Sequence, residues 1–156
     1  MRIALEEARK AGEEGEVPIG AVLVSAGEVI GKGRNQPVAS CDPSAHAEIL
    51  ALREGSMRVK NYRLPDSTLY VTLEPCIMCA GAILQARVSR LVFGAEDPKG
   101  GAVSSLYALL EDGRLNHRVE VTSGVLRGEC RELLQRFFRE RRKNIFTTED
   151  TENSEA

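Results

Sequence analysis

Two short stretches of the chain carry side chains that bind zinc. The first contains His46 and Glu48, and the second contains Cys76 and Cys79. A closed structural zinc site has four protein ligands, whereas one histidine and two cysteines make three and leave a coordination position for water. Because zinc lowers the pKa of such a water to about 7, hydroxide becomes available at neutral pH. These residues predict one zinc ion per chain and the chemistry of a hydrolase, with Glu48 as a spare carboxylate that is not a ligand.

The spacing within the first stretch predicts that it opens a helix. His46 and Glu48 are two residues apart, which is about 200° around a helix axis, so they do not share a side face. They can converge at a helix end. Asp42 followed by Pro43 is typical of an N-cap and a first helical position, which predicts a helix from there to about Met57.

The second stretch is also predicted to open a helix. Pro75 is typical of a first helical position, and Cys76 and Cys79 are three residues apart, which places them on one face of the first turn. Two helix N-termini then point at one metal ion. Their positive dipole ends and the zinc favour thiolate over thiol, and thiolate is the form that binds metal.

Alternating helix and strand signals predict an α/β fold, a three-layer sandwich with a mixed sheet of about five strands and helices on both faces. Residues 68–73 and 90–94 flank the cysteine helix, so we expect a crossover between two parallel strands. Ligand sites of such sheets lie beyond the carboxyl ends of the strands, where the first of these runs leads to Cys76. Further strands are expected at 20–25, 28–33 and 118–122, and further helices at 3–14, 105–110 and 128–144.

The length of 156 residues is that of one domain. Residues 147–156 hold four acidic residues and no Lys or Arg, so we expect an acidic, disordered tail behind a zinc-binding domain at 1–146. No apolar run approaches the ~20 residues of a membrane span and no leader precedes the first helix, so a cytoplasmic protein without membrane contact is expected. Four cysteines in such a protein favour metal binding or free thiols over disulfides.

The net charge of −2 hides a segregation of charge along the chain. Without residues 147–156 the chain has 21 basic and 19 acidic residues, a net charge of +2. A local basic patch can bind phosphates even on a protein that is acidic overall. Composition alone favours the alternative, a solvated helix face. The basic cluster lies shortly before the tail and consists of Arg136, Arg139, Arg141, Arg142 and Lys143.

The His-x-Glu and Pro-Cys-x-x-Cys pair resembles the signature of the zinc-dependent cytidine and nucleobase deaminases. The likeness covers nearly the whole chain, and in combination it is similar to the bacterial tRNA-specific adenosine deaminases. The sandwich fold expected above is also the fold that this resemblance implies. The other matching stretches are 16–22, Asn35, Asp42-Pro43, 69–73, Leu115-Asn116-His117-Arg118-Val119, and Phe137-Phe138 ahead of Arg141-Arg142.

The resemblance implies that adenosine is converted to inosine at the first, wobble position of a tRNA anticodon, with an arginine tRNA as the substrate. Zinc held by His46, Cys76 and Cys79 would activate the water, and Glu48 would pass protons to the ring nitrogen and the departing amine. Bases of an anticodon loop are already partly unstacked, which makes extrusion of the target base easier. The resemblance also implies a homodimer in which both subunits complete each site, and no organic cofactor.

Three of the substrate-binding residues that the resemblance implies lie in loops. Asn35 would hydrogen-bond the target base, since an amide offers both a donor and an acceptor to a purine edge. Asp97 and Lys99 fall in the loop where relatives contact nucleotides near the flipped base. Each has a plain alternative, because asparagine often forms turns and the adjacent Pro98 would make any surface loop look similar.

Three further substrate-binding residues are implied closer to the C-terminus. Asn116 would touch the RNA, although a turn-forming asparagine would have the same sequence context. Phe138 would stack on a base, and Arg141 would meet phosphates. The neighbouring Phe137 and the leucines before it form an apolar stripe, so at least one of the two phenylalanines is expected in the core.

Two other functions remain open from the residues alone. A deaminase of free guanine, cytosine or a nucleoside would need the same zinc group and the same carboxylate. A zinc-stabilised RNA-binding module without activity would not need Glu48. Cys41 could act as a fourth ligand that closes the zinc shell, but we expect a small loop residue there, and Cys130 is expected to pack in a helix.

Overall fold

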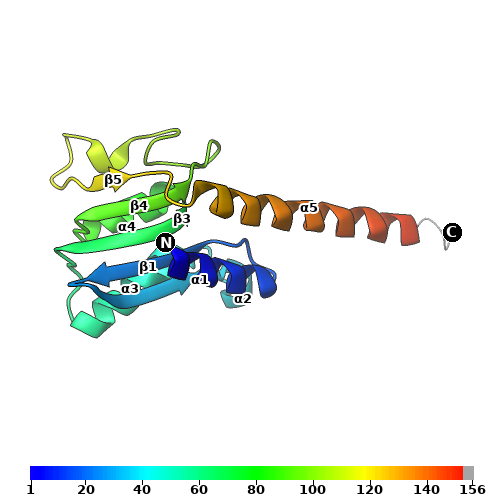
Figure 1. Cartoon of the computed structure of the whole chain (residues 1–156), viewed down its shortest axis with the longest axis horizontal. Helices are drawn as coiled ribbons and strands as arrows, with labels where there is room; N and C mark the ends of the chain where they lie inside the picture. The colour runs from blue at the N-terminus through cyan, green and yellow to red at the C-terminus, as the bar shows by residue number, and fades with distance from the viewer. Residues whose placement is uncertain (153–156) are drawn as a thin grey trace.

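A five-stranded mixed sheet with the order β2-β1-β3-β4-β5 lies between two layers of helices, so the predicted three-layer α/β sandwich is confirmed (Figure 1). The structure, a computed structural model, describes the backbone of residues 1–152 and the side chains of residues 1–145. The strands are β1 (Gly20–Ser25), β2 (Glu28–Arg34), β3 (Ser67–Leu73), β4 (Arg90–Ala95) and β5 (Glu120–Thr122). The helices are α1 (Arg2–Glu13), α2 (Pro37–Ser40), α3 (Ala47–Val59), α4 (Ile77–Gln85) and α5 (Arg127–Glu152), with a 3₁₀ turn η1 (Leu109–Glu111).

The sheet is antiparallel at one side and parallel at the other. β1 pairs antiparallel with β2, to which a two-residue turn joins it, and antiparallel with β3. β3, α4 and β4 form the expected crossover, and both β3 with β4 and β4 with β5 are parallel. The carboxyl ends of β3 and β4 therefore lie at the same edge of the sheet. From the end of β3 the chain continues directly to α4.

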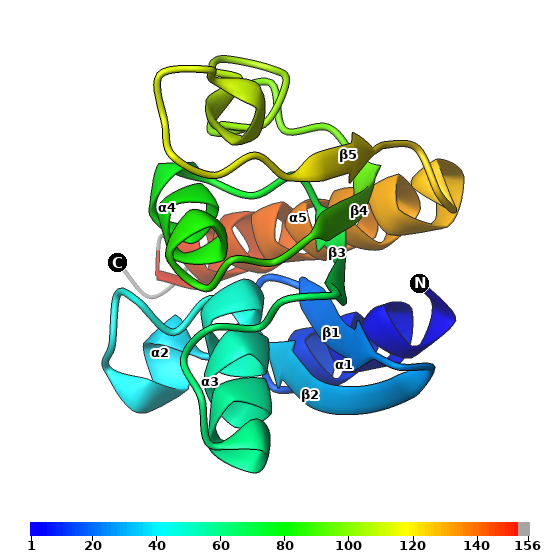
Figure 2. The same cartoon turned by 90° about the vertical axis from the view of Figure 1, so that its left-hand side faces the viewer.

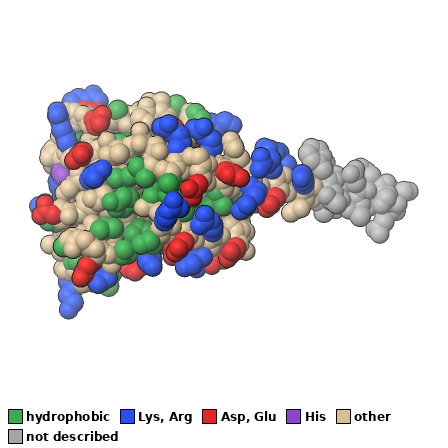
Figure 3. Space-filling model, in the orientation of Figure 1, with side chains coloured by type: hydrophobic (Ala, Val, Ile, Leu, Met, Phe, Trp, Pro, Cys, Tyr) green, Lys and Arg blue, Asp and Glu red, His purple; other side chains and the backbone are tan. Residues whose placement is uncertain are grey.

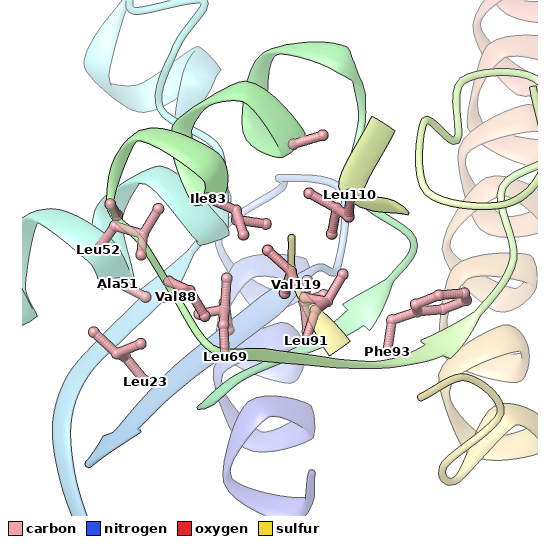
Figure 4. Packing of buried hydrophobic residues seen from close by; sticks show 14 of the residues in the cluster. Leu23, Ala51, Leu52, Leu69, Ile83, Val88, Leu91, Phe93, Leu110 and Val119 are labelled. Atoms are coloured by element: carbon pink, nitrogen blue, oxygen red, sulfur yellow. The ribbon is translucent and has the colours of Figure 1, made fainter. Parts of the chain in front are cut away.

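Helices cover both faces of the sheet. α1 and α5 pack on one face, and α3 and α4 lie on the other face, as Figure 2 shows. The main core fills the space between the sheet and the second pair, where Leu23, Leu69 and Leu91 from three adjacent strands meet Ile83 of α4 (Figure 4). Each such side chain contributes ~1.5–3 kcal/mol by leaving water. The core thus fixes both α3 and α4 against the same strands.

Two predicted helices differ from the structure in a way that matters for the site. The helix that was expected to begin at Asp42-Pro43 begins at Ala47 instead. The carboxylate of Asp42 accepts hydrogen bonds from the backbone N–H and the hydroxyl of Ser44, so it forms a turn and not a helix cap. A separate short helix, α2, precedes that turn. The helix expected at 105–110 is only the turn η1, because the backbone N–H groups of Ser104 and Ser105 bind the carboxylate of Glu74.

The C-terminal helix is longer than the sequence predicted. α5 continues to Glu152 and extends away from the body of the protein, whereas a helix end near Asn144 and an acidic tail at 147–156 were expected (Figure 1). Residues 153–156 lie outside the described part of the chain, and the domain boundary at residue 146 stays a prediction. Among the described residues, no helix combines the length and the hydrophobicity that a membrane crossing requires.

Candidate active site

The three predicted zinc ligands lie at the N-termini of α3 and α4. His46 is the N-cap of α3 and Cys76 is the N-cap of α4, each with extended backbone, and Cys79 follows in the first turn of α4. Both caps thus lie just outside the helices in which the sequence placed them. Neither side chain forms a capping hydrogen bond with its helix, so both are available to turn toward the metal site. This position at a helix end explains how His46 and Glu48 converge although they are two residues apart.

The histidine nitrogen lies at the distance from both sulfurs that a tetrahedral zinc ion requires, and the three ligand atoms all lie within 4.8 Å of one another. The Nδ1 atom of His46 lies 3.6 Å from the sulfur of Cys76 and 3.5 Å from the sulfur of Cys79. Zinc bonds of about 2.3 Å to sulfur and about 2.0–2.1 Å to nitrogen, at tetrahedral angles, place nitrogen and sulfur about 3.6 Å apart. Among the described residues this is the one group of three or more potential ligands found close together. The donor set therefore fits zinc, with Nδ1 as the histidine ligand.

The thiols of the group influence each other's ionisation. Hydrogen bonds from Cys79 and His46 lower the pKa of the Cys76 thiol to about 3. The pKa of Cys79 is raised, because this thiol donates to the Cys76 thiolate and is itself buried. The hydrogen bond to Cys76 also raises the pKa of His46. One sulfur is thus a thiolate at neutral pH, which is the state that binds metal.

Glu48 lies beside the metal group and is shielded from solvent. Its side chain is 4% exposed, and Oε2 accepts a hydrogen bond of 3.3 Å from the sulfur of Cys79. Burial raises the pKa of this carboxyl above its usual range. A buried carboxyl beside the metal group can accept a proton and return it, which is what a general acid and base must do.

Asn35 holds the start of α3 in place. Because His46 is turned toward the metal site, Oδ1 of Asn35 accepts a 3.0 Å hydrogen bond from the N–H of Ala47, the first residue of the helix. α3 also lies very close to β2, since a Cβ atom at Gly33 would lie 2.1 Å from the carbonyl oxygen of Ala47. No hydrogen bond from the Nδ2 group of Asn35 is found among the described residues. The amide is therefore predisposed to donate a hydrogen bond to a ligand.

A groove of about 940 Å³ begins at Asn35 and brings four of the six predicted substrate residues together. Asp97 and Lys99 line it from the loop after β4, and Phe138, which is 43% exposed, lines it from α5. Basic residues of α5 continue along the same groove, and Figure 3 shows blue side chains gathered where the helix leaves the body of the protein. The groove is further lined by Val17, Ile19, Leu73, Ala95, Glu96, Arg131, Leu134, Gln135, Arg139 and Arg142.

The other two predicted substrate residues lie elsewhere. Asn116 is exposed and accepts a 3.3 Å hydrogen bond from Arg87, which follows the C-terminal end of α4 and thus lies away from Cys76. The guanidinium of Arg141 lies over the ring of Phe137, 5.7 Å from its centre, and does not line the groove. Phe137 faces a second, smaller groove between α1 and α5.

Glu74 is a site residue that the sequence analysis missed. Glu74 directly precedes the Pro-Cys pair and is only 2% exposed. Burial of its carboxyl opposes ionisation. Hydrogen bonds from the hydroxyl of Ser105 and from the backbone of Ser104, Ser105 and Asp97 outweigh this effect and lower the pKa. The signal in the sequence is a charged residue at the end of an apolar strand, where a buried carboxylate needs partners.

The remaining two cysteines lie outside the metal group. Cys41 is exposed, and its sulfur lies 3.8 Å from the carbonyl oxygen of Val38. Cys130 is buried against Leu5 and Ala95 on the other side of the sheet. Neither thiol reaches His46, so the described residues offer three protein ligands and not four.

Comparisons with known proteins agree with this geometry. The profile of the MafB19-like deaminase family matches residues 1–142. The tRNA-specific adenosine deaminase of Haemophilus influenzae is 57% identical over 92% of this chain and 83% of its own length.

The chain belongs to the tRNA-specific adenosine deaminase family.

Solved structures extend the likeness to the fold. A structure from work on A-to-I editing by tRNA:A34 deaminases at the wobble position of transfer RNA has a TM-score of 0.83 and 49% identity, over 86% of this chain and 97% of that one. The guanine deaminase from Nitrosomonas europaea has a TM-score of 0.76 and 26% identity, over 87% of this chain and 81% of that one. The predicted enzyme class is confirmed, because a deaminase is a hydrolase that cleaves C–N bonds.

Proposed function

We propose that this deaminase converts adenosine to inosine at the wobble position of a tRNA, with one zinc ion held by His46, Cys76 and Cys79. The observation that supports this best is the distance of the His46 nitrogen from both sulfurs, which fits zinc, beside a buried carboxyl, Glu48. The relatives named for tRNA deamination cover nearly the whole chain. Their shared activity is therefore the first candidate for this protein.

The reaction consumes one water and one adenine base and releases ammonia. Zinc, when bound, acts as a Lewis acid and lowers the pKa of a water at the site. Glu48 would take one proton of that water on its carboxylate and deliver it to the ring nitrogen, and would then take the second proton from the hydroxyl group formed at the base carbon and deliver it to the departing amine. Its burial keeps bulk water from competing for these protons. Asn35 donates from Nδ2 to an acceptor on the edge of the base and holds the base beside Glu48.

The groove supplies the contacts that a polynucleotide needs. Lys99, Arg139 and Arg142 line it and can neutralise phosphates. Phe138 is exposed enough to stack on a base that flanks the target. A free base would need none of these contacts beyond the pocket next to Asn35. The extent of this groove favours a tRNA anticodon loop over a free base, and the resemblance favours an arginine tRNA.

One experiment separates the substrate classes. The zinc-loaded protein is incubated with total tRNA, with an arginine tRNA transcript that carries adenosine at the wobble position, and with free guanine, cytosine and cytidine. We expect ammonia and inosine from the two tRNA samples only. Ammonia from free guanine with none from tRNA would refute the proposed substrate. The guanine deaminase with the same fold shows that this fold can carry that reaction.

A homodimer is part of the proposal, because one face of the chain exposes an apolar groove of about 640 Å³ between α3 and α4. Met57 and Tyr62 on this face are 79% and 66% exposed. Both helices begin at the metal ligands, so a second copy seated here would pack against the two helices that hold the site. Sedimentation should give twice the chain mass, and Met57→Glu should give the monomer. A monomeric wild-type protein would contradict this part. Such an enzyme is expected to act in the cytoplasm, where tRNA is used.

A further inference from the structure

A loop between β4 and η1 forms one wall of the groove, and its shape depends on a single buried carboxylate. The carboxylate of Glu74 accepts five hydrogen bonds, all from residues of this loop. Oε1 accepts from the N–H of Asp97 at 3.1 Å and from the hydroxyl of Ser105. Oε2 accepts from three consecutive N–H groups, those of Val103, Ser104 and Ser105, at 2.9–3.1 Å.

This arrangement is unusual for a buried charge. A buried carboxylate is normally paired with Lys or Arg, yet Glu74 forms no ion pair among the described residues. Backbone N–H groups replace the cation, and they are available only while the loop keeps its path. The carboxylate and the loop conformation therefore require each other.

The loop also lies too close to Glu74 for any side chain at one position. A Cβ atom at Gly101 would lie 2.3 Å from the carboxyl carbon of Glu74. The following residue, Ala102, is buried, and its N–H donates to the carbonyl oxygen of Pro75 at 2.9 Å. The loop is thus fastened to the two residues directly before the metal ligand Cys76.

The part of the loop that reaches the groove is short. Asp97 uses its carboxylate within the loop, since Oδ1 accepts from the N–H groups of Lys99 and Gly100. Asp97 therefore shapes a turn, and the exposed Lys99 is the residue of this turn that carries a positive charge into the groove. Glu74 binds the N–H of Asp97 and so fixes the beginning of the same turn.

From these contacts we infer that Glu74 is a positioning residue for the polynucleotide substrate. It holds the 97–105 loop so that Lys99 and the groove wall meet the nucleotides beside the target base, and it does not touch the reacting atoms. This inference rests on the proposed function for its readout in catalysis. The hydrogen bonds that carry it belong to the chain alone.

The test uses Glu74→Gln, which keeps the size of the side chain but replaces one acceptor oxygen by a donor that faces N–H groups. The zinc-loaded variant should keep one zinc per chain. Its KM for the tRNA substrate should rise by about 10-fold or more, with kcat within a few-fold of wild type, because the loop binds substrate and is displaced from its place. Amide hydrogen exchange at residues 103–105 should become faster. Glu74→Asp keeps the charge, so its KM should lie between the value of Glu74→Gln and that of the wild type.

Two further variants keep the test decisive if Glu74→Gln folds poorly. Gly101→Ala pushes the loop away from an intact carboxylate and should raise KM in the same way. Gly128→Ala is its control, because a Cβ atom there meets nothing within 4 Å. Glu14→Gln is the control for loss of a carboxylate, since Glu14 pairs with Arg34 at the surface.

Each outcome decides the question. Lower thermal stability with unchanged KM and unchanged exchange at residues 103–105 would show that Glu74 is only structural and would overturn the inference. Wild-type protein that ignores tRNA would refute the proposed function instead. In that case the exchange measurement still decides whether Glu74 holds the loop.

Discussion

The metal group and the groove wall differ in how they are built, although they lie side by side. The metal group consists of a few side chains at the ends of α3 and α4, and a packed core holds both helices against the sheet. The groove wall is a loop that hydrogen bonds to Glu74 hold in place, facing the exposed residues of α5. Catalysis requires the metal ligands and the carboxyl of Glu48 at fixed positions, whereas binding of a nucleic acid requires complementary charge and shape. The difference predicts that substitutions divide into those that abolish turnover and those that alter binding.

The largest effect is expected at the metal ligands. Cys76→Ala should remove the zinc and reduce activity to background, because two remaining ligands hold zinc poorly. The thermal unfolding temperature should fall as well, since the ion joins the starts of two helices. Metal analysis, activity and calorimetry on the same sample check this. Cys41→Ala is the matched control and should keep zinc, because that thiol lies outside the group.

The next largest effect concerns Glu48→Gln. The amide keeps the size and polarity of the carboxyl but cannot carry a proton, so turnover should fall by at least ~10²-fold. Zinc content and tRNA affinity should stay as in the wild type. Near-normal turnover in this variant would mean that Glu48 is structural and that the proton transfers belong to another group.

The basic residues of α5 should affect binding and leave the zinc content unchanged. Arg139 and Arg142 line the groove, so replacing both by alanine should lower the slope of log K against log salt by about 1–2. Arg141→Ala should change the slope less, because its guanidinium lies over Phe137 outside the groove. Affinity measured across a salt series distinguishes the two variants. Equal slopes in all three proteins would show that this face is only solvated.

The sequence predicted the metal group better than the elements that hold it. Residue type and spacing identify a zinc donor set, because zinc chemistry restricts both. The predicted start of α3 was wrong because Asp42 closes a turn with Ser44. Capping residues in the sequence do not distinguish such a turn from the start of a helix. Asn35 was expected at the substrate, and its hydrogen bond to Ala47 depends on a contact between β2 and α3 that no local pattern encodes.

The groove could be predicted only in part, for a related reason. Glu74 acts through a loop that lies more than twenty residues away in sequence, so its partners depend on the fold. Asn116 and Phe138 match the family pattern equally well, yet the structure places only Phe138 at the groove. Strand and helix periodicities, in contrast, depend on burial at each position. The positions of the strands and the parallel pair around α4 therefore follow from the pattern, while the order of the strands and the loop contacts do not.

The smallest effect is expected at Cys130, which shows what a thiol does without the partners that Cys76 has. Burial beneath α1, together with the negative charge of Glu129, raises the pKa of Cys130 to about 11, while the ammonium of Met1 opposes the shift. A thiol whose folded pKa is raised stabilises the native state fully below its unfolded pKa of about 8.5, and this stabilisation is lost as the pH rises to the folded value. The unfolding temperature of the wild type should therefore decline more between pH 9 and 11 than that of Cys130→Ala, with equal kcat and zinc content in both proteins at pH 7. Parallel curves would show that burial leaves this thiol unperturbed, and loss of zinc in the variant would contradict the separation between the two faces of the sheet.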